Sequence, residues 1–116
     1  MKLKNFYEKT NGDYNEVVRR LVNEKLVMKY LKKFPDGNYF QQLKSSVAEQ
    51  DYETAFRSAH TLKGLCLTLG FENMSKPVIE LTEKLRAGMT ENAQEYIVEI
   101  EPVYNDTIKW IGELSE

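Results

Sequence analysis

Residues 51–70 read DYETAFRSAHTLKGLCLTLG, and this is the most regular amphipathic segment of the chain. Its apolar residues recur at steps of three and four, which predicts one buried face of a helix. The set comprises Tyr52, Ala55, Phe56, Ala59, Leu62, Cys66 and Leu69. Asp51 is placed to accept hydrogen bonds from the free N–H groups of the first turn, and Gly70 can adopt the left-handed conformation that ends a helix. We therefore expect a helix with a cap at each end.

Similar spacing continues on both sides of this segment. It predicts short helices over about 14–21 and 27–34, and longer ones over about 40–47, 74–85 and 93–114. Turn signals at Pro35-Asp36-Gly37-Asn38 and Ala87-Gly88 separate them. Because proline lacks a backbone N–H, Pro77 is expected in a first turn or at a kink. For the same reason Pro102 is expected to kink or split the last helix near Ile100–Glu101.

The fold class follows from this pattern of helices. Long amphipathic helices joined by short turns indicate an all-α fold, an antiparallel up-and-down four-helix bundle with one or two short N-terminal helices packed on one end. A length of 116 residues is ordinary for one domain, so we expect a single domain over 1–116. With 41% hydrophobic and 29% charged residues, the composition is typical of a folded chain rather than a disordered one.

The compartment is predicted from what the sequence lacks. No apolar run reaches the ~18 residues that a membrane span needs, and residues 1–14 lack the apolar core of a secretory signal. The single cysteine, Cys66, cannot form an internal disulfide. We therefore expect a cytoplasmic protein that does not bind a membrane.

The charges are nearly balanced but unevenly distributed. Sixteen basic and eighteen acidic residues give a net charge of −2, which argues against a dedicated nucleic-acid binder. Residues 1–33 carry nine basic and four acidic side chains, whereas residues 87–116 carry one basic and seven acidic. We interpret these as two solvated faces of one bundle; the alternative is a basic surface that touches a membrane or an acidic partner.

His60 is the only histidine, and its surroundings indicate chemistry. On a helical wheel it falls roughly 120° from the centre of the apolar face, which predicts an exposed ring. Gly64 lies one turn later, where glycine costs about 1 kcal/mol relative to alanine, so its bare backbone indicates the close approach of something large. Lys63 and Arg57 lie within one turn of the ring. These cations would stabilise a phosphoryl group on an imidazole nitrogen.

The same residues are compatible with other interpretations. An exposed ring can be a nucleophile or simply a solvated surface group beside a chance glycine. A zinc site or a Cys–His pair is not predicted, because Cys66 and His60 fall on nearly opposite faces of the helix. No nucleotide-binding or metalloprotease motif is present.

The run Ala59-His60-Thr61-Leu62-Lys63-Gly64, with Gly70 six residues later, resembles the signature of histidine-containing phosphotransfer (HPt) domains. That signature is A-H-x-L-K-G followed by a glycine at the end of the helix. The resemblance covers about 14–116. It implies that His60 accepts the phosphoryl group, that Lys63 helps to hold it, and that Gly64 lets a receiver domain approach.

The sequence departs from the family pattern at two places. Small residues usually follow the Lys-Gly pair, but here Leu65, Cys66 and Leu67 follow it. Cys66 is predicted to pack in the core, and Leu67 to form either an apolar rim for a partner, together with Arg57, or an obstacle to one. Thr82 stands where the family often has Gln or Glu near the active histidine.

The resemblance implies a phosphocarrier in a His–Asp phosphorelay. It would accept a phosphoryl group on His60 from a receiver-domain aspartate and pass it to another receiver, as a stoichiometric monomeric carrier rather than a turnover enzyme. The implied partners are response-regulator receiver domains and a hybrid histidine kinase. No cofactor is expected on the carrier, since Mg²⁺ belongs to the receiver. The alternatives are a non-phosphorylated helical adaptor that docks receiver or kinase domains, and an unrelated bundle with a chance motif.

Overall fold

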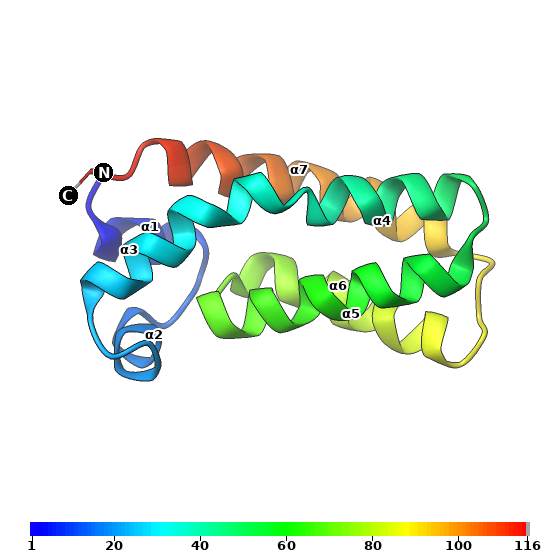
Figure 1. Ribbon diagram of the computed structural model, residues 1–116, viewed down its shortest axis with the longest axis horizontal. Coiled ribbons are helices and arrows are strands. Elements are labelled where there is room, and N and C mark those ends of the chain that lie inside the picture. Colours follow the sequence, from blue (N-terminus) through cyan, green and yellow to red (C-terminus); the bar gives the residue numbers. More distant parts are fainter. Residues whose placement is uncertain (116) are drawn as a thin grey trace.

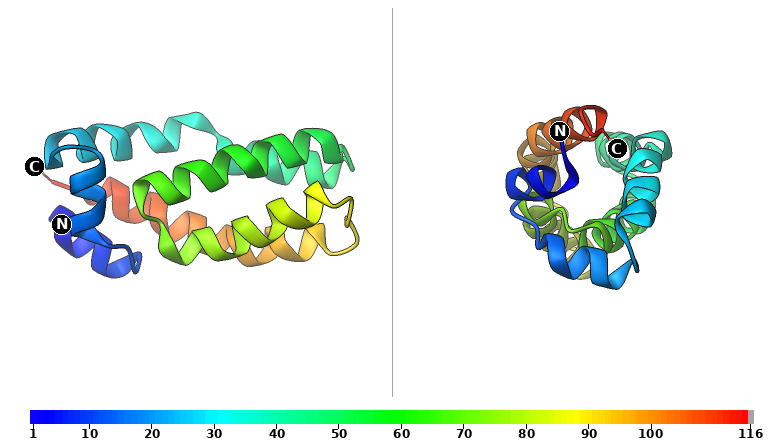
Figure 2. Two further views of the ribbon diagram at one scale, coloured as in Figure 1. Left: turned by 90° about the horizontal axis from the view of Figure 1, so that it is seen from below. Right: turned by 90° about the vertical axis from the view of Figure 1, so that its left-hand side faces the viewer.

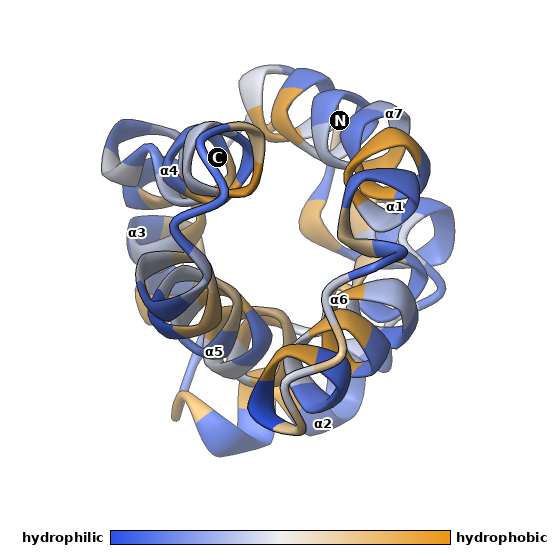
Figure 3. Cartoon of the chain, turned by 90° about the vertical axis from the view of Figure 1, so that its right-hand side faces the viewer, coloured by the Kyte–Doolittle hydropathy of each residue, from blue (hydrophilic) through white to orange (hydrophobic). Residues whose placement is uncertain are grey.

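Four antiparallel helices enclose the core of the protein (Figure 1). They are α4 (Tyr39–Ala48), α5 (Tyr52–Leu69), α6 (Glu72–Arg86) and α7 (Ala93–Gly112). In the computed structural model, which describes residues 1–115, each helix packs against the next and α7 closes the ring against α4 (Figure 3). Over these residues the chain forms seven α-helices and one 3₁₀ turn without any strand, so the predicted all-α class is confirmed.

Three further helices precede the bundle, rather than the one or two predicted. α1 (Leu3–Lys9) and α2 (Tyr14–Arg20) lie across one end of the bundle, and α3 (Glu24–Lys33) continues through a 3₁₀ turn (Phe34–Gly37) into α4 (Figure 2). Helix α1 was not predicted, although Leu3, Phe6 and Tyr7 follow the three- and four-residue spacing of a helix face and all three are buried. Its helical state depends on docking: Phe6 and Tyr7 are buried against parts of the chain more than sixty residues away.

Helix α5 begins and ends at the predicted residues. The Asp51 carboxylate accepts a hydrogen bond from the backbone N–H of Thr54 at 3.2 Å and from its hydroxyl at 2.7 Å. Gly70 has a φ of 75°, in the left-handed region where glycine carries no steric penalty. Ala59, Leu62 and Cys66 on the inner face are fully buried, which confirms the predicted core face and the core position of Cys66.

The two prolines lie inside helices. α7 runs unbroken from Ala93 to Gly112 with Pro102 inside it, so of the two predicted outcomes near Ile100–Glu101 the split does not occur, and the kink stays a prediction. The exposed position of Pro102 explains this, because a carbonyl that loses its intrahelical partner there can be hydrated by water. Pro77 is buried in the second turn of α6 rather than in its first.

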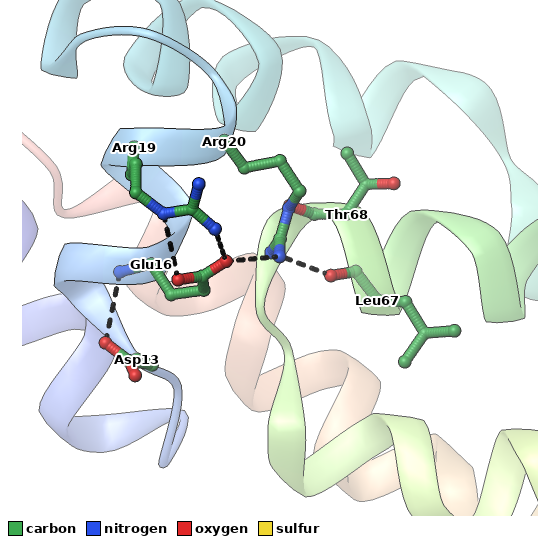
Figure 4. A network of polar contacts seen from close by, with 6 residues as sticks. All are labelled: Asp13, Glu16, Arg19, Arg20, Leu67 and Thr68. Atoms are coloured by element: carbon green, nitrogen blue, oxygen red, sulfur yellow. Dashed lines mark hydrogen bonds and ion pairs between the residues drawn. The ribbon is translucent and has the colours of Figure 1, made fainter.

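The N-terminal helices are fastened to the end of α5. The Tyr7 hydroxyl donates a hydrogen bond to the carbonyl of Leu69 at 2.7 Å. Arg20, on α2, donates to the carbonyls of Leu67 at 2.9 Å and Thr68 at 3.0 Å, which the end of a helix leaves without partners (Figure 4). Glu16 lies 3.8 Å from the Arg20 guanidinium and orients it. The C-terminal end of α5 is therefore held in place by two other helices.

The structure also bears on membrane insertion. Among residues 1–115, no helix is both long enough and apolar enough to cross a bilayer.

Candidate functional site

His60 lies in the middle of α5 and is exposed, as the helical wheel predicts. Its ring is supported from one side by Phe56, one turn earlier, with 5.9 Å between the ring centroids. Phe56 belongs to the predicted apolar face but is only half buried, because it lies at the shoulder of the helix. The imidazole is therefore exposed to solvent and has the apolar ring of Phe56 beside it.

Lys63 lies three residues after His60 and points toward α6. Its Nζ atom is 3.5 Å from Oε1 of Glu83, so the ammonium group is tied to the neighbouring helix. The side chain of Lys63 is 24% exposed, so part of it remains accessible to solvent. Because residues three apart share one face of a helix, the ammonium lies on the same side as the imidazole.

Glu83 and Arg86 complete the charged part of the site. The second carboxylate oxygen of Glu83 accepts a hydrogen bond from Nε of Arg86 at 3.2 Å. The Arg86 guanidinium lies over the ring of Phe56, with 5.1 Å from its central carbon to the ring centroid, which is within cation–π range. Desolvation raises the pKa of Glu83, but the charges and hydrogen bonds of Arg86 and Lys63 outweigh it and leave that pKa lowered.

Gly64 and Leu67 extend the face of α5 that carries His60. Residues at positions i, i+4 and i+7 line up along one side of a helix. No atom lies within 4 Å of the place where a side chain on Gly64 would begin, so the backbone there is open to a large partner. Leu67 is 48% exposed, and its side chain points away from the Arg20 network (Figure 4). Open backbone at Gly64 and the exposed apolar side chain of Leu67 therefore lie on the same side of α5 as the imidazole.

Two residues named from the sequence make their contacts elsewhere. Arg57 pairs with Glu53 at 3.1 Å, toward the start of α5, and its side chain is 65% exposed. Thr82 is fully buried, and its hydroxyl donates to the carbonyl of Val78 at 2.7 Å within α6. Lys63 and Gly64 thus lie beside His60 on α5. Arg57 pairs with Glu53 toward the start of α5, and the Thr82 hydroxyl bonds within α6.

Three residues of the site were not found from the sequence. Phe56 is four residues before His60, so helical spacing could have identified it. Glu83 and Arg86 lie on α6, and their place beside α5 depends on how far the two helices are shifted along each other. A single sequence carries no signal for that shift.

The lone cysteine does not take part in this site. Cys66 is buried on the opposite face of α5, and burial raises the pKa of its thiol to about 12, so it stays protonated. No group of three or more His, Cys, Asp or Glu residues is arranged to hold a metal ion anywhere in residues 1–115.

The site thus combines an exposed imidazole, two nearby cations and open space at the Gly64 backbone. Comparison with protein families gives a match to the Hpt domain over residues 37–109. This segment is well over half of the chain and contains every residue of the site. Searches of curated proteins and of solved structures gave no significant match.

Proposed function

The chain belongs to the Hpt domain family, whose members are histidine phosphotransfer carriers of phosphorelays and not turnover enzymes, and on this premise we propose that His60 is its phosphoryl acceptor. The observation that supports this most directly is the grouping of an exposed imidazole, the Lys63 ammonium and the bare backbone of Gly64 on one face. A buried or crowded imidazole could not meet a protein partner.

The proposed chemistry is the transfer of a phosphoryl group between two proteins. The lone pair of a neutral imidazole nitrogen attacks the phosphorus of an aspartyl phosphate and forms a P–N bond. The P–O bond to the aspartate breaks, and its electron pair stays on the carboxylate. The proton on the other ring nitrogen remains, so the product is a phosphorylated imidazolium that can release this proton to water. Onward transfer to a second receiver is the reverse of this step.

The carrier contributes position and charge to this reaction. Lys63 can donate a charge-assisted hydrogen bond to the transferred group, and Gly64 allows the backbone of the receiver to come close. Leu67 and the exposed methylenes of Arg57 would form the rim of the contact. We propose that Mg²⁺ is supplied by the receiver, that the carrier itself uses no cofactor, and that it acts as a cytoplasmic monomer on receiver domains, including that of a hybrid kinase.

The test is to incubate the protein with phosphorylated receiver domains and to look for acid-labile, base-stable phosphate. We expect the protein to be labelled and the His60→Gln variant to remain unlabelled. The free energy of unfolding of this variant should lie within about 0.5 kcal/mol of the wild-type value, as is usual for exposed substitutions. Labelling of His60→Gln would place the acceptor at another residue. Binding of receivers without any labelling would support the adaptor function instead.

A further inference from the structure

Glu83 connects the two cations of the site. Its carboxylate lies 3.5 Å from the Lys63 ammonium on α5 and accepts a hydrogen bond from Arg86 on α6 at 3.2 Å. It is the acidic member of a cluster with two positive charges, so the cluster keeps a net charge of +1.

Both cations belong to the surroundings of His60. Lys63 follows it by three residues on the same helix face. Arg86 covers Phe56, whose ring centroid is 5.9 Å from that of His60. A phosphoryl group on the imidazole would therefore lie close to Lys63 and Arg86, the two cations with which the Glu83 carboxylate is paired.

We propose that Glu83 is a positioning residue that competes with the phosphoryl group for Lys63 and Arg86, and so weakens the hold of the protein on the phosphoryl group. This inference rests on the proposed function, because it requires phosphorylation of His60. In the unphosphorylated protein Glu83 pairs with the Lys63 ammonium of α5 and with Arg86 on its own helix. In the phosphorylated protein it makes the phosphoryl group easier to pass on.

The exposure of the Glu83 and Arg86 side chains allows this exchange of partners. Glu83 is 52% exposed and Arg86 50%, so either can turn to water at little cost. An ion pair that is this exposed is weak, and a phosphoryl group with up to two negative charges can displace the carboxylate. Lys63 is a flexible point charge with three donors and can turn from one acceptor to the other.

Two effects of Glu83 act in the same direction. Lys63 must leave the carboxylate before it can bind the phosphoryl oxygens, and the carboxylate also repels them. The lowered pKa of Glu83 keeps the carboxylate ionised at neutral pH. The Glu83→Gln variant keeps the size of the side chain and an oxygen acceptor for Lys63 but removes the negative charge, so it abolishes the repulsion and weakens the competition for Lys63.

The experiment measures the equilibrium constant for phosphoryl exchange between a receiver aspartate and His60. This constant depends only on the free energies of the separated proteins with and without the phosphoryl group. An effect of the variant on the affinity of the docked complex therefore does not change it. We expect Glu83→Gln to shift the equilibrium toward phosphorylated His60 by about two- to fivefold, which is the range for exposed charge pairs. The shift should shrink at 1 M salt, where the Debye length is about 3 Å.

Glu101→Gln is the matched control. Glu101 forms an exposed ion pair with Lys44 at 2.8 Å between α4 and α7, so this variant has the same change of net charge away from α5 and α6. It should leave the equilibrium unchanged. The inference is wrong if wild type is labelled on His60 but Glu83→Gln gives an equal or smaller phosphorylated fraction, or if Glu101→Gln has the same effect. Absence of labelling in wild type would instead count against the proposed function.

Discussion

At the scale of single residues, Lys63 and Arg57 form a natural comparison, because each is a cation three residues from His60 on α5. Lys63 pairs with Glu83 of α6, whereas Arg57 pairs with Glu53 toward the start of α5. Lys63→Ala should slow phosphoryl transfer by about tenfold, less than the 10²–10³-fold loss of a donor in a water-excluded site. Arg57→Ala should slow it much less. Rapid-quench measurement of single-turnover transfer separates the two variants, and equal losses would show that only net charge matters.

Gly64 allows stability and function to be separated at one residue. The Gly64→Gln side chain would start in open space, and glutamine is the better helix former, so the variant should be more stable by a few tenths to about 1 kcal/mol. Transfer should nevertheless be impaired, because the new side chain occupies the path of the receiver. Thermal melting and phosphotransfer are measured on one preparation. Gly112→Gln, which also extends into open space, should leave transfer unchanged.

Normal transfer by the more stable Gly64→Gln protein would contradict the role of Gly64 in partner approach. A loss of transfer together with a loss of stability would point to damage to the fold.

At the scale of elements, the first turn of α5 depends on the Asp51 carboxylate. The hydroxyl and the backbone N–H of Thr54 both donate to it, and these bonds lower the pKa of Asp51. A carboxyl group whose pKa is lower in the folded state stabilises the fold above its unfolded value of about 3.9, and this contribution is lost as the pH falls through the lower folded value. Asp51→Ala should therefore lower Tm by a few degrees at pH 7.

Asn is as good a helix cap as Asp but does not titrate, so Asp51→Asn serves as the control. Its Tm should be close to the wild-type Tm at pH 7. The difference in Tm between the two proteins should change below about pH 4, because residue 51 gains a proton only in the wild type. Melting curves from pH 2 to 7 measure this. A variant Asp51→Asn that melts as low as Asp51→Ala would show that the charge, not the hydrogen bonds, makes the cap.

The success of sequence reasoning also differs between elements. The ends of α5 were predictable, because Asp51 and Gly70 act on residues only a few positions away. The continuity of α7 through Pro102 was not, since it depends on which side of the helix faces water. The approach of Glu83 and Arg86 to α5 could not be predicted from the sequence either, because it depends on the packing of two helices. The catalytic role assigned to His60 came from spacing and from a family resemblance, and it stays a prediction.

At the scale of the whole molecule, Gly12 is where the N-terminal helices meet the bundle. A Cβ atom on Gly12 would lie 2.3 Å from the carbonyl oxygen of Gly70 and 2.8 Å from the ring of Tyr7. Because the first of these neighbours is backbone, Gly12→Ala should destabilise the protein by about 1–3 kcal/mol. Gly112→Ala meets no atom within 4 Å and should change stability by less than about 0.5 kcal/mol. Chemical denaturation of both variants checks this, and equal stabilities would mean that α1 and α2 are not firmly docked.

The hydrogen bond from Tyr7 to Leu69 joins residues 62 positions apart, and this separation affects biosynthesis. A ribosome adds about 5–20 residues per second, so Tyr7 is made roughly 3–12 s before its partner Leu69. The contact of Lys9 with Trp110 forms later still, after most of α7 has been made. During this interval a nascent chain carries the apolar face of α1, formed by Leu3, Phe6 and Tyr7, without its partners, and chaperones can bind it.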